Sequence, residues 1–186
     1  MNVDAQDILA FWFREATPEQ WFAKDDQFDA QIKSRFSSVV ARLAEQIETE
    51  GVTNWEGTPK GSLASVLVLD QFPRNIFRGT PQAFAFDDKA REVAQRLIDV
   101  GGDMDLTSQE RQFLYLPYMH VEDLDAQEFC VELFKTRLED QSQLSYAVDH
   151  RDIIQRFGRF PHRNAILGRL STEAELAFLA DGGFAG

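Results

Sequence analysis

The fold is decided by the sequence S-L-A-S-V-L-V-L-D-Q-F, at positions 62–72. This segment is apolar on almost every side. A helix of that kind must be covered all round, so we predict a buried central helix here. A buried strand is the alternative, because periodicity does not separate the two structures over so short a run. The rest of the chain favours the helix, since helix signals recur and strand signals are nearly absent.

A long amphipathic pattern precedes this segment, at positions 25–50, where apolar residues recur every three or four positions and Gly51 follows. Capping sequences and glycines predict further helices at positions 4–13, 18–22, 87–101, 125–140, 144–157 and 172–182. A helix that begins at position 107 is expected to bend or stop near Pro117. We therefore predict an all-α protein with a single helical domain over residues 1–186. About nine helices would lie in antiparallel pairs, as a bundle or a short superhelix.

Composition excludes several classes of protein. The net charge of −12 argues against nonspecific nucleic-acid binding, which needs a cationic surface. The longest apolar stretch, at positions 63–69, is too short to span a bilayer, and the acidic N-terminus does not resemble a signal peptide. A cytoplasmic protein is the expectation. Cys130 is the only cysteine, so no internal disulfide forms, and its apolar neighbours predict a buried, inert thiol.

Two segments contain a similar and unusual sequence motif: L-D-Q-F-P-R-N at 69–75 and R-F-G-R-F-P-H-R-N at 156–164. Each places Phe-Pro beside Arg and Asn, whose hydrogen-bond donors are costly to bury without partners. We therefore predict that the two motifs lie together and form one shared site. The alternative is scaffolding, in which Arg side chains fix the Phe-Pro turns by bonding to backbone carbonyls.

The segment 151–169 has five Arg and a single acid, Asp152, in an otherwise acidic chain. This pattern fits a local positive pocket for a small anion or carboxylate. It also fits a basic segment beside a solvated acidic helix face.

Asp70 follows Leu63, Val66 and Leu67 at helical spacing, so it belongs to the apolar face near a helix C-terminus. A carboxylate there needs a cation, and Arg74 or an Arg of the second motif is the expected partner. The pair is either structural or part of a catalytic group, as a general base or a metal ligand.

The three histidines, His120, His150 and His162, lack the spacing of a metal site, so we predict no metal and no cofactor. His150 shares a helix face with Tyr146, Ile153 and Phe157, and we expect it in the core or in a pocket.

Three segments together resemble the bacterial proteins grouped as domain of unknown function 924: L-D-Q-F-P-R-N-I-F-R-G-T-P-x-A-F, F-L-Y-L-P-Y-M-H-V-E-D, and H-R-D-I-I-Q-R-F-G-R-F-P-H-R-N-A-I-L-G-R-L-S-T. The likeness covers almost the whole chain. It implies a tetratricopeptide-like α/α superhelix and no established activity.

Our preferred hypothesis is a pocket that binds a small anionic or carboxylate ligand, with Arg for charge, Asn for orientation and His for proton transfer. Its expected lining residues are Arg74, Asn75, His150, Arg159, His162, Arg163 and Asn164. The first alternative is a non-enzymatic adaptor that holds a peptide or protein partner in an α-solenoid groove. The second is a hydrolase or isomerase that uses Asp70 and His150 as catalytic residues. Whether the protein is an enzyme, and its oligomeric state, stay open.

Overall fold

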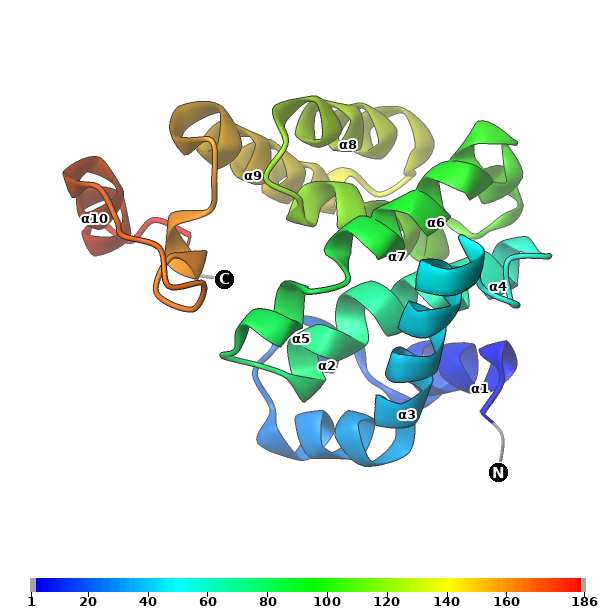
Figure 1. Cartoon of the computed structure of the whole chain (residues 1–186). Helices are drawn as coiled ribbons and strands as arrows, with labels where there is room; N and C mark the ends of the chain where they lie inside the picture. The colour runs from blue at the N-terminus through cyan, green and yellow to red at the C-terminus, as the bar shows by residue number, and fades with distance from the viewer. Residues whose placement is uncertain (1–2, 185–186) are drawn as a thin grey trace.

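The structure is a computed structural model that describes residues 3–184 (Figure 1). The predicted all-α class is confirmed, because the described residues form helices and no strands. The α-helices are α1 (Ala5–Ala10), α2 (Pro18–Phe22), α3 (Asp26–Glu50), α4 (Pro59–Val66), α5 (Phe72–Ile76), α6 (Asp87–Asp99), α7 (Ser108–His120), α8 (Leu124–Arg137), α9 (Leu144–Phe157) and α10 (Glu173–Ala180). No helix of residues 3–184 is long and apolar enough to cross a membrane.

The central segment is helical, so the strand alternative is wrong. A π-helical turn, Leu67–Gln71, joins α4 directly to α5, and the side chains along 62–72 are buried. The turn precedes Pro73, which has no backbone N–H to continue a regular helix. Instead the N–H of Phe72 bonds the carbonyl of Leu67, five residues back. If 59–76 is counted as one helix, the described residues contain nine helices, as predicted.

The other helices cover this central helix. α3 packs against α5 and the π-helical turn, while α1, α6 and α7 pack against α4. From α6 to α9, each helix also packs on the next one along the chain (Figure 1). The core is rich in aromatic rings, as expected: Phe72 lies within 6.1 Å of Phe11, Trp12 and Phe36, measured between ring centroids.

Several predicted helix ends are confirmed by their caps. Thr17, Thr107 and Thr172 form capping boxes, and Gly51 ends α3 with a left-handed φ of 77°. The predicted start of α8 at Asp125 is wrong. The helix begins at Leu124, and the side chain of Asp123 caps it by accepting a hydrogen bond from the N–H of Ala126.

Of the two outcomes expected at Pro117, a bend or a stop of the helix, the stop is wrong. α7 continues through the proline and ends at His120, which therefore stands on the last turn. Cys130 is buried, as expected, and burial raises the pKa of its thiol.

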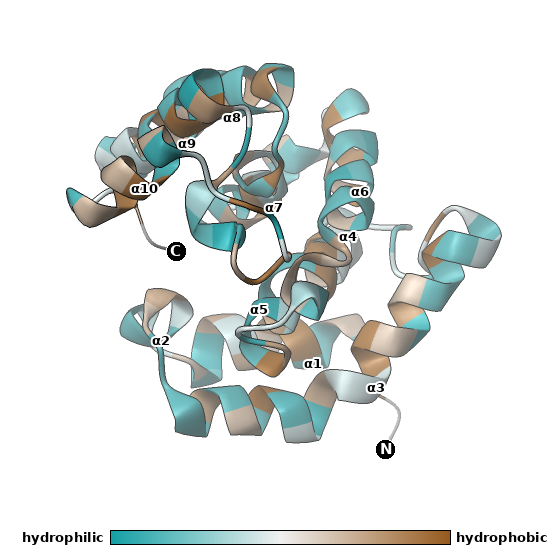
Figure 2. Ribbon diagram, turned by 60° about the vertical axis from the view of Figure 1, so that its left-hand side comes forward, coloured by the Kyte–Doolittle hydropathy of each residue, from teal (hydrophilic) through white to brown (hydrophobic). Residues whose placement is uncertain are grey.

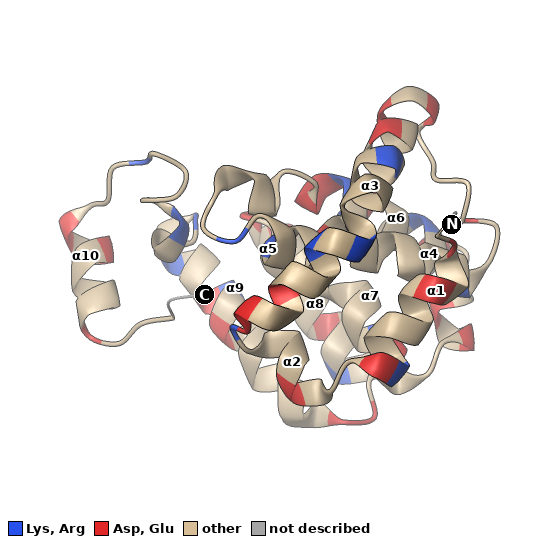
Figure 3. Cartoon of the chain, turned by 90° about the horizontal axis from the view of Figure 1, so that it is seen from below, with Lys and Arg blue, Asp and Glu red and all other residues tan. Residues whose placement is uncertain are grey.

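The C-terminal segment has a small core of its own. Ile153, Ile154 and Phe160 are buried together, apart from the main core, and α10 packs against the 3-10 turn Pro161–Arg163. Figure 2 shows this segment beside α9 and above α2 and α5. In Figure 3, acidic residues are spread along the helices, whereas several basic residues lie in the C-terminal segment.

Candidate functional site

Asp70 lies in the π-helical turn and its side chain is fully buried. One carboxylate oxygen is 2.7 Å from Nδ1 of His120 and 3.3 Å from Nη1 of Arg74, and the other accepts a hydrogen bond from Gln71 at 2.5 Å. The prediction of a buried Asp70 paired with an Arg is confirmed. Burial alone would raise the pKa of Asp70, but the charge of Arg74 and the bond to His120 outweigh it and lower the pKa to about 2.

His120, on the last turn of α7, meets Asp70 across fifty positions of sequence. Burial and the nearby Arg74 lower the pKa of His120, so its imidazole is neutral at neutral pH. An ionised carboxylate only accepts hydrogen bonds, so Nδ1 carries the proton and donates a hydrogen bond to Asp70. The lone pair is then on Nε2, and the side chain keeps 15% of its surface exposed.

The first motif places its cation next to this pair. Arg74 donates to both oxygens of Asp87, at 2.8 and 3.0 Å, and to the carbonyl of Asp70 at 2.7 Å. Asn75 donates to Asp29 at 2.8 Å, and Arg78 donates to the same carboxylate at 2.6 and 2.9 Å. Each Arg of this wall is therefore paired with a carboxylate.

Most of the second motif has a structural role. Arg159 donates to both oxygens of Glu175, at 2.6 and 2.9 Å, and to the carbonyl of Leu170 at 2.8 Å. Asn164 donates to Glu175 at 3.2 Å and to Ser171 at 3.1 Å. The expectation that Arg159 and Asn164 line the pocket is wrong, because the carboxylate of Glu175 draws both toward α10.

Arg163 joins the two motifs but also acts as a brace. Its Nη1 donates to the carbonyl of His120 at 2.8 Å and lies 3.7 Å from the Asp87 carboxylate that pairs with Arg74. Its guanidinium stacks between the rings of Phe84 and Phe160, each 4.5 Å away. Burial and the charge of Arg74 lower the pKa of Arg163 to about 10, so the guanidinium stays charged at neutral pH. The two motifs are therefore neighbours, as predicted, with Asp87 between their guanidinium groups.

A cavity of 470 Å³ opens beside the Asp70–His120 pair. Its wall comes from α2, the π-helical turn, α5, α7, α9 and the segment after α10. The lining residues are Trp21, Phe22, Ala23, Gln71, Arg74, Asn75, Arg78, Leu116, Met119, His120, Gln143, Tyr146, His150 and Phe184. Of the expected binding residues, Arg74, Asn75 and His150 line this cavity, whereas Arg159, His162, Arg163 and Asn164 do not.

The two other histidines differ from His120. His150 bonds through Nδ1 to the carbonyl of Tyr146 at 2.7 Å, and burial lowers its pKa. No hydrogen bond joins it to Asp70 among the described contacts, and the imidazole that contacts Asp70 is that of His120. His162 lies against Phe160 and Phe184, with ring centroids 5.5 and 5.2 Å away, and its buried Nδ1 has no hydrogen-bond partner in the described structure.

His120 is the site residue that the sequence analysis missed. Its partner is fifty positions away, and no local spacing links the two. In residues 3–184, no group of three or more His, Cys, Asp or Glu side chains has the arrangement of a metal site.

These features define a class: an all-helical protein with a buried carboxylate–imidazole pair in the wall of a pocket that is partly polar and partly aromatic. The chain belongs to the family described as bacterial protein of unknown function (DUF924), whose model matches residues 8–183. It is similar to a solved structure of a protein of unknown function from Agrobacterium tumefaciens, with 42% sequence identity and a TM-score of 0.86. That likeness covers 96% of this chain and 97% of the other. No curated protein matches the chain.

Proposed function

We propose that the protein binds a small polar ligand with at most one negative charge in this pocket, and that His120 accepts a proton from the ligand or from a water bound beside it. The observation that carries this proposal is the 2.7 Å contact between Asp70 and Nδ1 of His120 in the cavity wall. A carboxylate in that position fixes the imidazole tautomer and stabilises the imidazolium that forms on proton transfer.

The charges around the cavity support the limit on ligand charge. Arg74 and Arg78 would attract an anion, but Asp87 and Asp29 already neutralise them. Asp70 adds a further negative charge behind His120. A ligand with several negative charges would therefore meet little net positive field, whereas one carboxylate can approach the donor edges of the Arg side chains.

The lining residues also restrict the reaction. No Ser, Thr or Cys stands among the described residues that line the cavity, so a covalent step through an aliphatic hydroxyl or a thiol has no candidate there, and the phenol of Tyr146 is the hydroxyl in the lining. General-base activation of water or proton transfer on the ligand itself is the chemistry that His120 supports. A hydrolase and an isomerase both fit this description, with His120 in place of His150 as the partner of Asp70.

A peptide-binding adaptor is the second candidate. The observation that favours it is the successive packing of α6, α7, α8 and α9, an arrangement that solenoid proteins use to present a concave surface. An adaptor would bind extended peptides without any dependence on the ionisation of His120.

The proposal is tested by measuring the NMR signals of the His120 imidazole during ligand titration. Protein with ¹⁵N-labelled histidine is titrated with acetate and other small carboxylates, and ring nitrogen shifts are read by NMR. We expect the Nε2 signal of His120 to move on binding, and His120→Gln to lose the ligand-dependent gain in Tm, which arises by mass action.

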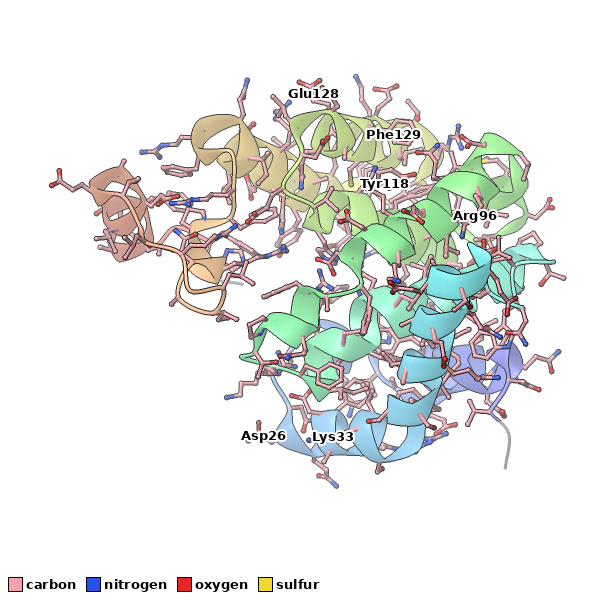
Figure 4. The ribbon with its side chains drawn as sticks, viewed as in Figure 1. Asp26, Lys33, Arg96, Tyr118, Glu128 and Phe129 are labelled. Atoms are coloured by element: carbon pink, nitrogen blue, oxygen red, sulfur yellow. The ribbon has the colours of Figure 1, made fainter. Side chains whose placement is uncertain are left out.

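Lys33→Gln is the control, since Lys33 is exposed on α3 (Figure 4), outside the cavity lining. Carboxylates that leave the His120 signals unchanged and raise no Tm would contradict the proposal. A Tm gain with peptides alone would favour the adaptor.

A further inference from the structure

The cavity has two chemically different walls. One wall is polar and contains Gln71, Arg74 and His120, from the central helix and the end of α7. The other is apolar and includes Trp21 and Phe22 of α2. A ligand that contacted only the polar wall would leave the second wall exposed to water.

The rings of α2 are fixed in place. Nε1 of Trp21 donates to the carbonyl of Trp12 at 2.9 Å, and its ring lies edge-on to Phe113 with centroids 5.0 Å apart. The ring of Phe22 lies parallel to that of Phe113, at an interplanar angle of 4° and a centroid distance of 6.1 Å. These contacts hold the surface in one geometry before any ligand arrives, which lowers the entropy cost of binding.

Aromatic side chains on both sides of the cavity are unusually exposed. Phe22 keeps 60% of its surface accessible, and Tyr146, across the cavity on α9, keeps 52%. Exposed aromatic rings that gather at one concavity mark a binding surface more often than isolated exposed residues do. Phe184 adds another ring to the cavity lining.

Tyr118 shows that the aromatic residues of α7 are not all directed to this cavity. It precedes the lining residue Met119, yet its ring packs against Phe129 of α8 with centroids 5.2 Å apart, and Figure 4 shows it between those two helices. Its hydroxyl donates to Gln95 at 2.8 Å. The rings at the cavity are therefore a distinct group, contributed by α2, α9 and the segment after α10.

We propose that the ligand is an aryl carboxylate, whose flat ring lies on the Trp21–Phe22 surface while its carboxylate faces Arg74 and reaches the Nε2 lone pair of His120 through a bound water that donates to both. The inference rests on the proposed function and specifies the ligand class of the same pocket. A volume of 470 Å³ accommodates one ring and a short chain. Aromatic walls favour a flat ring over a puckered one of similar size, because stacked and edge-on contacts need planar partners.

The experiment compares three probes by calorimetric titration: 3-phenylpropionate, 3-cyclohexylpropionate and propionate. They share the carboxylate and differ in the ring. We expect 3-phenylpropionate to bind at least about tenfold more tightly than propionate, and several-fold more tightly than 3-cyclohexylpropionate. Phe22→Ala should remove most of this preference and leave the affinity for propionate unchanged.

Leu176→Ala is the matched control. Leu176 on α10 is 55% exposed, close to the value for Phe22, and does not line the cavity. It should leave all three dissociation constants unchanged. Equal affinity for the phenyl and cyclohexyl probes, or an unchanged phenyl preference in Phe22→Ala, would overturn the aryl assignment.

The ring signals of His120 separate the two proposals. If propionate moves them and 3-phenylpropionate binds no more tightly, the aryl assignment fails and the proposed function stands. If no probe reaches His120, both fail.

Discussion

Arg163 donates a hydrogen bond to the carbonyl oxygen of His120 over 2.8 Å. The second motif thereby braces the end of the helix that carries the pocket imidazole, without lining the pocket itself. The same Arg163 faces Asp87, which pairs with Arg74 of the first motif. The hypothesis of a binding site therefore fits the first motif, which lines the cavity. The hypothesis of scaffolding fits the second motif, which positions His120.

Arg163→Ala should weaken the protein even without ligand. The substitution removes the donor for the His120 carbonyl and the cation between two aromatic rings, so we expect a loss of about 1–3 kcal/mol in the free energy of unfolding. Denaturant titration measures it. Arg156→Ala is the control, because it removes an exposed guanidinium of α9 that also lies over two rings but has no buried carbonyl to brace. A loss no larger than that of the control would show that Arg163 is not a brace.

Asp70→Asn should be among the most damaging substitutions of its size. It removes a fully buried negative charge that offsets Arg74 and holds His120, and breaking such a pair costs about 3–5 kcal/mol. Asp88→Asn removes a carboxylate whose side chain is 83% exposed, and should change stability by less than about 0.5 kcal/mol. Similar unfolding midpoints for the two variants would contradict the ion-pair interpretation.

Stability should also fall in acid through Asp70. Its pKa is lowered from 3.8 to about 2, so the unfolded chain binds a proton before the native protein does. The contribution of Asp70 is complete above pH 4 and is lost as the pH falls toward 2. It amounts to about 2 kcal/mol, from about 1.4 kcal/mol per pKa unit. The fall in the free energy of unfolding from pH 5 to pH 2 should be smaller by about 2 kcal/mol in Asp70→Asn than in the wild type, because carboxyls such as Glu175 titrate in both proteins.

The sequence predicted contacts that depend on local spacing and missed those that do not. Asp70 and Arg74 are four residues apart on one helix, so their pairing followed from helical geometry. His120 reaches Asp70 only because the packing of α7 brings together residues fifty positions apart.

Glu175 shows the same limit of sequence-based prediction, because one of its two structural roles depends on local spacing and the other does not. Its spacing from Thr172 predicted a capping box, which the structure confirms. The spacing did not reveal that the same carboxylate binds Arg159 and Asn164. Two residues expected in the pocket were therefore assigned to the wrong role.

Glu175 should control the local stability of α10. Arg159 lowers the pKa of this carboxyl to about 2, and α10 packs mainly on the turn that precedes it. Glu175→Gln should therefore increase amide hydrogen exchange along α10 while the amides of α3 keep their protection, because a weakly attached segment opens separately. Glu173→Gln removes an exposed charge from the same first turn and so controls for the helix dipole. Equal exchange in the two variants would refute the brace.

His162 should make the protein sensitive to mild acid. Burial and the charge of Arg163 lower its pKa to about 4, and its buried Nδ1 has no partner in the described structure. Between pH 6.5 and 4, His162 binds a proton in the unfolded chain but not in the native protein. The free energy of unfolding therefore falls as the pH falls. By pH 5 this loss reaches about 2 kcal/mol, again at about 1.4 kcal/mol per pKa unit.

His162→Phe tests this directly, because a phenyl ring suits the neighbouring Phe160 and Phe184 and does not titrate. Urea unfolding of both proteins at pH 7.5 and pH 5 should show a loss on acidification that is smaller by about 2 kcal/mol in the variant. His120 and His150 also have a lowered pKa, but they titrate in both proteins and cancel in the difference. An identical loss in the two proteins would mean that His162 takes up its proton in the folded state as readily as in the unfolded chain.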